Sequence, residues 1–150
     1  MHGEPLTILL VEDNPDHADL VMRSLEDHKM SNKIFHVSDG EAAIDYLQRK
    51  GEYSDPQSSP VPHVVLLDLR LPKVDGLEVL KIIREDEKLS HLPVVVLTTS
   101  NGDKDVAQAY KHRANSYVVK PLDFACFAEM MKDLGFFWLC WNHNPWIPEE

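Results

Sequence analysis

The chain has 150 residues, of which 43% are hydrophobic and 27% charged, a composition typical of one globular domain with a core of ordinary size. Its 25 acidic and 15 basic residues give a formal net charge of −10, and such an acidic surface repels nucleic acid and anionic membranes. No apolar run approaches the ~18 residues of a membrane-spanning helix, and the N-terminus lacks the basic and apolar regions of an export signal. We therefore expect a cytoplasmic protein that has no nucleic-acid or membrane partner.

Short apolar runs alternate with segments of helical periodicity along the chain. Each apolar run has the length of a strand, and the segments between them carry their apolar residues on one helical face. We predict five strands, at residues 7–11, 34–37, 63–67, 93–97 and 116–119.

Several turn residues predict where helices begin and end. Asn14 followed by Pro15 has the pattern of a cap and a first helical residue, so the first helix should begin there. The second helix should end at Gly51, where helices favour glycine. Residues 52–62 hold three prolines and three serines, which predicts a loop, and a further helical pattern covers residues 103–112.

Strands that are apolar throughout and alternate with helices are typical of a parallel sheet covered on both faces. The crossover connections of such a sheet are right-handed. We therefore predict an α/β fold, a doubly wound five-stranded parallel sheet in the order 2-1-3-4-5, whose ligand site lies beyond the carboxyl ends of the strands.

Polar side chains follow four of the predicted strands. Glu12 and Asp13 follow the first strand, Asp68 follows the third, Thr98 the fourth and Lys120 the fifth. Any one of them is ordinary in a turn, but three converging carboxylates repel one another unless a cation lies between them. Such hard oxygen ligands favour Mg²⁺ that keeps waters and accepts a phosphoryl oxygen, and the lysine and the hydroxyl suit the remaining phosphoryl oxygens.

Four segments in order, "ILLVEDNPDHADL", "VVLLDLRLPKVDGLEVL", "PVVVLTTS" and "ANSYVVKP", resemble the receiver domain of response regulators in two-component signalling. The resemblance covers residues 5–134 and implies the flavodoxin-like receiver fold. It implies that Asp68 is the phosphoacceptor, a carboxylate nucleophile that attacks a phosphohistidine of a sensor histidine kinase. It further implies a signalling protein that catalyses only its own phosphorylation and dephosphorylation.

The resemblance also assigns a metal site and a switch. Glu12, Asp13 and Asp68 would bind Mg²⁺ together with the backbone carbonyl of Arg70. Phosphorylation would draw Thr98 toward the phosphoryl group, and Tyr117 would fill the space that Thr98 leaves. Lys120 would pair with a phosphoryl oxygen, and its peptide bond to Pro121 would be cis, as is usual in the family. The changed surface is then formed by the helix at residues 103–112, the strand at 116–119 and the helix that follows Pro121, whose apolar residues include Phe124 and Phe127.

The segment after the last receiver helix is short and rich in aromatic residues. We expect residues 1–150 to form a single receiver domain with an extension at 136–150, so its output should be a protein contact with a downstream target. The proline-rich insert, "TTS" and "FFWL" resemble small receivers associated with bacterial phytochrome kinases, which commonly dimerise through their C-terminal part. The aromatic residues of this tail are Phe136, Phe137, Trp138 and Trp141. They either form a homodimer interface or pack on the surface of their own domain.

Other functions compete with this interpretation. A phosphotransfer shuttle in a phosphorelay would use the same site. A flavodoxin-like cofactor domain would need a loop rich in Ser, Thr or Gly after the first strand, whereas "VEDNPD" repels phosphate in the absence of metal. A magnesium-dependent phosphohydrolase places a second aspartate two residues after its nucleophile, and Arg70 occupies that position here. Arg70 beside the site is instead a candidate for setting the lifetime of the phosphoryl group.

Overall fold

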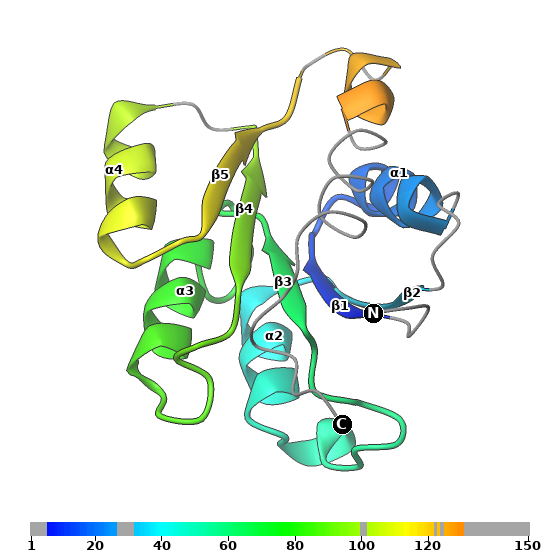
Figure 1. Cartoon of the computed structure of the whole chain (residues 1–150), viewed down its shortest axis with the longest axis vertical. Helices are drawn as coiled ribbons and strands as arrows, with labels where there is room; N and C mark the ends of the chain where they lie inside the picture. The colour runs from blue at the N-terminus through cyan, green and yellow to red at the C-terminus, as the bar shows by residue number, and fades with distance from the viewer. Residues whose placement is uncertain (1–5, 27–31, 100–101, 122, 124, 131–150) are drawn as a thin grey trace.

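The computed structural model describes residues 6–26, 32–99, 102–121, 123 and 125–130 (Figure 1). Helices and strands alternate through most of this part of the chain. Their order is β1 (Leu6–Val11), α1 (Pro15–Glu26), β2 (Asn32–Val37), α2 (Gly40–Leu47), the 3-10 turn η1 (Gly51–Tyr53), β3 (Val64–Leu67), α3 (Gly76–Glu85), β4 (Val94–Thr98), α4 (Asp103–Lys111) and β5 (Ser116–Val119). Residues 125–130 form a further helical segment. No helix in these ranges is both long and apolar enough to cross a membrane.

The five strands form one parallel sheet in the order β2-β1-β3-β4-β5, which confirms the predicted topology. Its register fixes which strand ends are neighbours. Val11 pairs with Leu67, so the residues that follow them emerge side by side from the sheet. Thr98 pairs with Val119 in the same way, which places Lys120 next to the end of β4.

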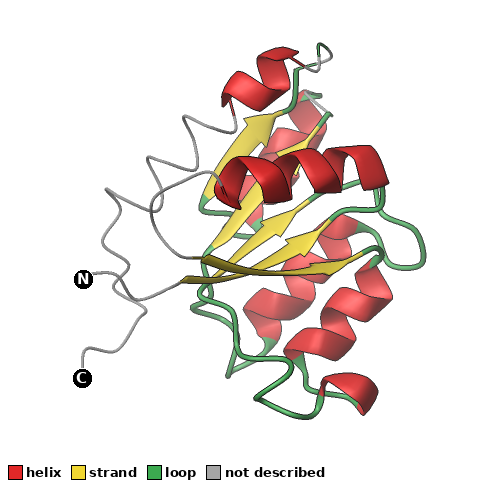
Figure 2. Cartoon of the chain, turned by 90° about the vertical axis from the view of Figure 1, so that its right-hand side faces the viewer, coloured by secondary structure: helices red, strands yellow, loops and turns green. Residues whose placement is uncertain are grey.

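Helices cover both faces of the sheet, as Figures 1 and 2 show. Helix α1 and residues 125–130 pack on one face, while α2, α3 and α4 pack on the other. Neighbouring residues of β1 alternate between the two cores, since Ile8 and Leu10 face α1 whereas Leu9 and Val11 face α2 and α3. Burial on both faces explains why β3 is apolar at every position and β4 at every position except its last, Thr98.

The start of α1 agrees with its prediction, and the end of α2 does not. The side chain of Asn14 accepts hydrogen bonds from the backbone N–H groups of Asp16 and His17 at 2.9 and 3.2 Å, as an N-cap does. Helix α2 ends at Leu47, before Gly51, and the left-handed residue after its cap is Arg49, with φ of 63°. The guanidinium of Arg49 donates to the carbonyl of Ser59 at 2.9 Å, which offsets the cost of this conformation. Gly51 instead opens η1, so its assignment as the C′ glycine is wrong.

Candidate functional site

The carboxyl ends of β1, β3, β4 and β5 bring the predicted polar residues into one place. Glu12, Asp68, Thr98 and Lys120 are all buried, whereas Asp13 is exposed at the rim. The sheet's hydrogen bonds continue past the strand ends, because the Asp68 N–H donates to the Val11 carbonyl at 3.1 Å and the Lys120 N–H donates to the Thr98 carbonyl at 2.7 Å. These bonds keep the ends of neighbouring strands in register, so that the side chains that follow them lie at the same edge of the sheet.

The three carboxylates form a compact cluster. Glu12, Asp13 and Asp68 each offer an oxygen, and these oxygens all lie within 4.8 Å of one another. Carboxylates at this separation repel one another in a partly buried site. Hard oxygen donors of this kind suit a divalent cation that keeps part of its water shell.

Lys120 is the cation that the chain itself supplies to this cluster. Its Nζ forms an ion pair with Oε1 of Glu12 and lies 3.4 Å from Oδ2 of Asp68. The same Nζ lies 3.1 Å from Nδ1 of His17, and 5.9 Å from the centre of the Phe127 ring. A buried ammonium is therefore surrounded by polar partners on one side and an aromatic ring on another, which is how a charge is accommodated in a core.

The buried carboxyl group of Glu12 has a raised pKa. Burial raises its pKa to about 7, and Asp68 adds to the rise, while the hydrogen bond from Lys120 acts in the opposite direction. The backbone N–H of Asn14 donates to Oε2 of Glu12 at 3.1 Å. The buried carboxylate is thus held from two sides, and a cation beside it would favour its charged form.

The backbone after β3 positions Asp68. The N–H of Arg70 donates to Oδ1 of Asp68 at 3.3 Å, so Oδ2 is the oxygen on the side of Lys120. Gly76, the first residue of α3, packs directly on this loop, and a Cβ there would lie 2.2 Å from the carbonyl oxygen of Asp68. Only glycine permits this approach, which fixes the strand end against the helix.

Thr98 and Tyr117 lie on the neighbouring strands β4 and β5. Thr98 is completely buried at the end of β4. Tyr117 pairs in register with Val96, on the edge strand β5, and is half-buried. Its ring lies 6.5 Å from that of Tyr110 on α4, which links the edge strand to that helix.

Comparison with known proteins decides the family of this fold and site. Residues 8–132 match the response regulator receiver domain family. The chain belongs to this family. Response regulators are signalling proteins. The order of strands, the acidic cluster and the buried lysine are therefore features of a signalling domain.

Two relatives and two solved structures are similar to this receiver over most of its length. It is 46% identical over 142 residues to the probable methanogenesis regulatory protein FilR2 of Methanothrix harundinacea, which covers 95% of this chain and 89% of that protein. It is 40% identical over 135 residues to response regulator Rcp1 of Synechocystis sp., which covers 90% of each. The Mn(2+)-bound structure of Rcp1 has a TM-score of 0.88 at 39% identity and covers 94% of this chain and 99% of that one. The phosphorylated cyanobacterial phytochrome response regulator RcpA has a TM-score of 0.89 at 35% identity and covers 95% and 99%.

Two expectations from the family resemblance have different outcomes in this receiver. The acidic cluster has the donor set of a divalent-cation site, in keeping with the Mn(2+)-bound form of Rcp1. The prediction of a cis peptide bond between Lys120 and Pro121 is wrong, because the described part of the chain has no cis peptide bond. The trans preference of a bond before proline is only about 0.5–1 kcal/mol, so the local surroundings decide the isomer.

Sequence reasoning missed two residues of the site. His17 has no metal-ligand spacing with the other histidines, and Phe127 is only one of several apolar residues in the predicted helix after Pro121. Their rings lie 5.5 Å apart in an edge-to-face arrangement, and both are next to Lys120. The signal for His17 is its place in the first turn of the helix that follows Glu12 and Asp13, because that turn faces the same strand ends.

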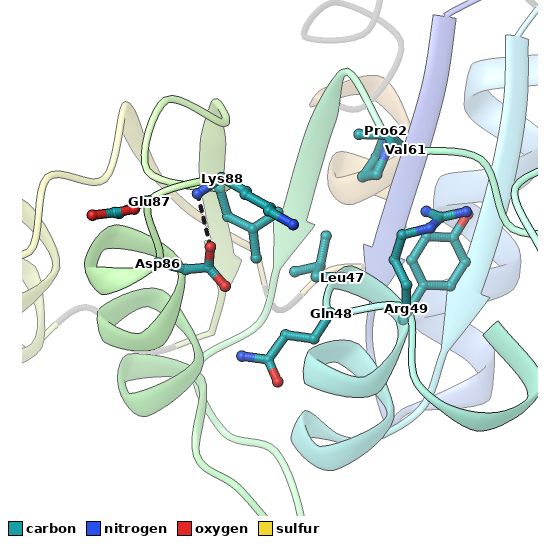
Figure 3. A pocket seen from close by; sticks show the side chains of 10 residues that line it. Leu47, Gln48, Arg49, Val61, Pro62, Asp86, Glu87 and Lys88 are labelled. Carbon is teal, nitrogen blue, oxygen red and sulfur yellow. Dashed lines mark hydrogen bonds between the residues drawn. The ribbon is translucent and has the colours of Figure 1, made fainter. Parts of the chain in front are cut away.

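A cavity of about 590 Å³ lies at the opposite end of the sheet (Figure 3). The end of α2, the loop before β3 and the loop after α3 line this open pocket, and its lining residues include Leu47, Arg49, Val61 and Lys88. None of the predicted site residues lines it. The cavity is therefore separate from the acidic site, and its walls combine apolar side chains with charges of both signs.

The predicted aromatic interface of this receiver lies outside the described residues. It comprises Phe136, Phe137, Trp138 and Trp141. The exposed apolar residues of the described part near the predicted output surface are Tyr110 on α4 and Val119 at the end of β5.

Proposed function

We propose that this response regulator accepts a phosphoryl group on Asp68 from a sensor histidine kinase, in a reaction that requires Mg²⁺. The observation that supports the proposal is the position of the Asp68 carboxylate between two different kinds of neighbour. One oxygen lies 3.4 Å from the Lys120 ammonium, and the same carboxylate belongs to the acidic cluster with Glu12 and Asp13. A carboxylate between a fixed cation and a divalent-metal site suits attack on a phosphoryl group.

The reaction itself is a displacement at phosphorus. An oxygen of Asp68 forms the new O–P bond, the P–N bond of the phosphohistidine breaks, and the imidazole leaves with its electron pair. Glu12, Asp13, Asp68 and the backbone carbonyl of Arg70 would bind Mg²⁺, which neutralises charge on the transferring phosphoryl oxygens. Lys120 stabilises another of these oxygens from the buried side.

The acyl phosphate adds about −1.5 to −2 charges and three acceptor oxygens at this site. The Thr98 hydroxyl, at the end of the neighbouring strand, would donate to one of them. A shift of Thr98 toward the phosphoryl group leaves space for Tyr117 at the edge of the sheet. Because the Tyr117 ring lies beside Tyr110 of α4, its movement changes the surface formed by α4 and β5.

The output of this receiver is then a phosphorylation-dependent protein contact. Tyr110 and Val119 are 51% and 39% exposed, and both are apolar residues on elements that Tyr117 would move. We assign the contact with a downstream protein, or with a second copy of the chain, to this surface and to the aromatic residues of the tail. RcpA is a phytochrome response regulator, which supports a phytochrome-type kinase as the phosphoryl donor. A cytoplasmic location is part of the same proposal.

The test is the intact mass of the full chain after incubation with phosphoramidate or acetyl phosphate and Mg²⁺. The wild type should gain one phosphoryl group, and the gain should disappear in EDTA and in Asp68→Asn. Asp19→Asn is the matched control, since Asp19 is an exposed carboxylate on α1 outside the cluster. A wild type that gains no phosphoryl group, or an Asp68→Asn variant that gains as much, contradicts the proposal.

A further inference from the structure

Three polar side chains among the described residues lie within hydrogen-bond range of the Lys120 ammonium, and they are not of one kind. Oε1 of Glu12 and Oδ2 of Asp68 belong to carboxylates, whereas Nδ1 of His17 belongs to an imidazole, 3.1 Å away. An ammonium has three N–H donors and no acceptor. The three donors thus match three neighbours, of which two are carboxylates and the third is the His17 imidazole.

This contact determines which ring nitrogen of His17 carries the proton. Because Lys120 can only donate, Nδ1 must accept with its lone pair, and the hydrogen of the neutral ring must be on Nε2. A doubly protonated ring would place two cations in contact. Burial and the Lys120 charge both lower the pKa of His17, which agrees with a neutral ring in this position.

Two further contacts hold the imidazole in place. The backbone N–H of His17 donates to the Asn14 side chain at 3.2 Å, which fixes the residue in the first turn of α1. The planes of the His17 and Phe127 rings are perpendicular, at 90°, and their centroids lie 5.5 Å apart. The acceptor that faces Lys120 thus belongs to a ring held between a helix start and a buried aromatic residue.

The chemistry of phosphorylation gives a neutral acceptor a specific use. Both carboxylates beside Lys120 change partners during the reaction, since Asp68 becomes an acyl phosphate and Glu12 belongs to the metal cluster. An acceptor that has neither role can keep one N–H of the ammonium fixed while the others turn toward the phosphoryl oxygen. We propose that His17 is a positioning residue for Lys120, whose Nδ1 holds the ammonium in the direction of the phosphoryl site. The inference rests on the proposed function of Asp68.

The contact can be tested without any phosphorylation. Long-range ¹H–¹⁵N correlation spectra of the ¹⁵N-labelled full chain assign the protonated nitrogen of each histidine ring. We expect the Nε2–H form for His17 in the wild type, and a change of the Nδ1 shift in Lys120→Met. The inference is overturned if the proton of the His17 ring is on Nδ1, or if the ring ¹⁵N shifts do not change in Lys120→Met. This holds whatever the phosphorylation assay gives.

The consequence for the reaction is tested by the rate of phosphorylation from phosphoramidate and Mg²⁺. His17→Leu keeps an apolar side chain of similar size and removes the acceptor, and it should slow phosphorylation about tenfold, as loss of a supporting partner typically does. His17→Asn places a carbonyl near the position of Nδ1 and should restore most of the rate. His91→Leu, an exposed histidine in the loop after α3, is the matched control.

Each result has one meaning. A His17→Leu variant that reacts at the wild-type rate, or a folded His17→Asn variant that is as slow as His17→Leu, overturns the positioning role. If His17→Leu does not fold, judged by circular dichroism, the comparison of His17→Asn with the wild type and the tautomer measurement decide the question. A wild type that gains no phosphoryl group instead overturns the proposed function, which the ring spectra distinguish from failure of the His17 contact.

Discussion

Arg70 and Asp105 form an ion pair that joins the loop after β3 to the first turn of α4. Arg70 is two residues after Asp68, and its backbone N–H donates to the Asp68 carboxylate at 3.3 Å. Asp105 belongs to the helix that borders the proposed output surface. The pair therefore connects the proposed phosphorylation site to that surface through one exposed side chain and one half-buried side chain.

Arg70→Ala should shorten the lifetime of the acyl phosphate and leave the fold intact. We expect the guanidinium, two residues after Asp68, to attract the oxygens of the proposed phosphoryl group and to limit the approach of water. Partly exposed ion pairs contribute about 0.2–1 kcal/mol, so the effect on hydrolysis should be at most about fivefold. The measurement is the decay of phosphorylated protein after removal of the phosphodonor.

Asp105→Asn is the companion to that variant, because it keeps Arg70 and releases it from α4. Its lifetime should lie between those of the wild type and Arg70→Ala, and the double variant should match Arg70→Ala. Equal lifetimes in all four proteins would rule out a role of this pair in the stability of the phosphoryl group.

Gly76→Ala should destabilise the protein. The added Cβ would meet the Asp68 carbonyl oxygen at 2.2 Å, and backbone atoms cannot yield as the end of a side chain can. Overpacking of this kind typically costs about 1–3 kcal/mol in the free energy of unfolding. Gly102→Ala is the control, since nothing lies within 4 Å of a Cβ there, and urea unfolding of both variants checks the difference. Equal midpoints would mean that the close packing of α3 on the Asp68 loop is not a constraint.

Mg²⁺ should raise the melting temperature of the protein. A ligand at one hundred times its Kd stabilises the native state by about 2.7 kcal/mol, which corresponds to roughly 5–10 °C for a domain of this size. Asp13→Asn should reduce the rise, because this exposed side chain belongs to the acidic cluster and can be changed without disturbing the core. Asp16→Asn, an exposed neighbour outside the cluster, should behave as the wild type. An unchanged rise in Asp13→Asn would place the metal elsewhere.

The stability of the protein should depend on pH through His17. Burial, and then the Lys120 charge, lower its pKa from the ordinary 6.5, while Asp68, Asp16 and Asp13 oppose the shift. At pH values just below 6.5, the His17 ring therefore binds a proton in the unfolded chain but stays neutral in the native state. The contribution of His17 is complete above the unfolded pKa and is lost as the pH falls through the native pKa.

The difference in unfolding free energy between the wild type and His17→Asn isolates this effect from the other titrating groups. It should increase in favour of the wild type as the pH rises toward about 6.5 and stay level above that. Urea unfolding of both proteins over this range measures it. A difference that is flat, or that changes in the opposite direction, would contradict the position of His17 beside a cation.

The fold and most of the site could be predicted because apolar strands carry a strong signal. Every residue of β3 and β4 is buried, so the runs of Val and Leu identify these strands directly. Parallel pairing then places Glu12 beside Asp68, since Val11 and Leu67 are partners in the sheet. Spacing along the chain was sufficient for these residues.

The remaining features depend on contacts between side chains far apart in the sequence. The end of α2 at Leu47 reflects a bond from Arg49 to the loop at Ser59, which no helix signal reveals. The ion pair between Arg70 and Asp105 depends on how α4 is rotated against the sheet. The contact of His17 with Lys120 spans 103 positions of the chain, and it follows only once α1 is packed against the strand ends.

The most direct test of the central claim is to locate the phosphoryl group on the chain. Borohydride reduces an aspartyl phosphate to homoserine, and mass spectrometry of the resulting peptides identifies the modified position. After incubation with phosphoramidate and Mg²⁺, homoserine should appear at position 68 and at no other acidic residue. Homoserine elsewhere with an unmodified Asp68 would contradict the account.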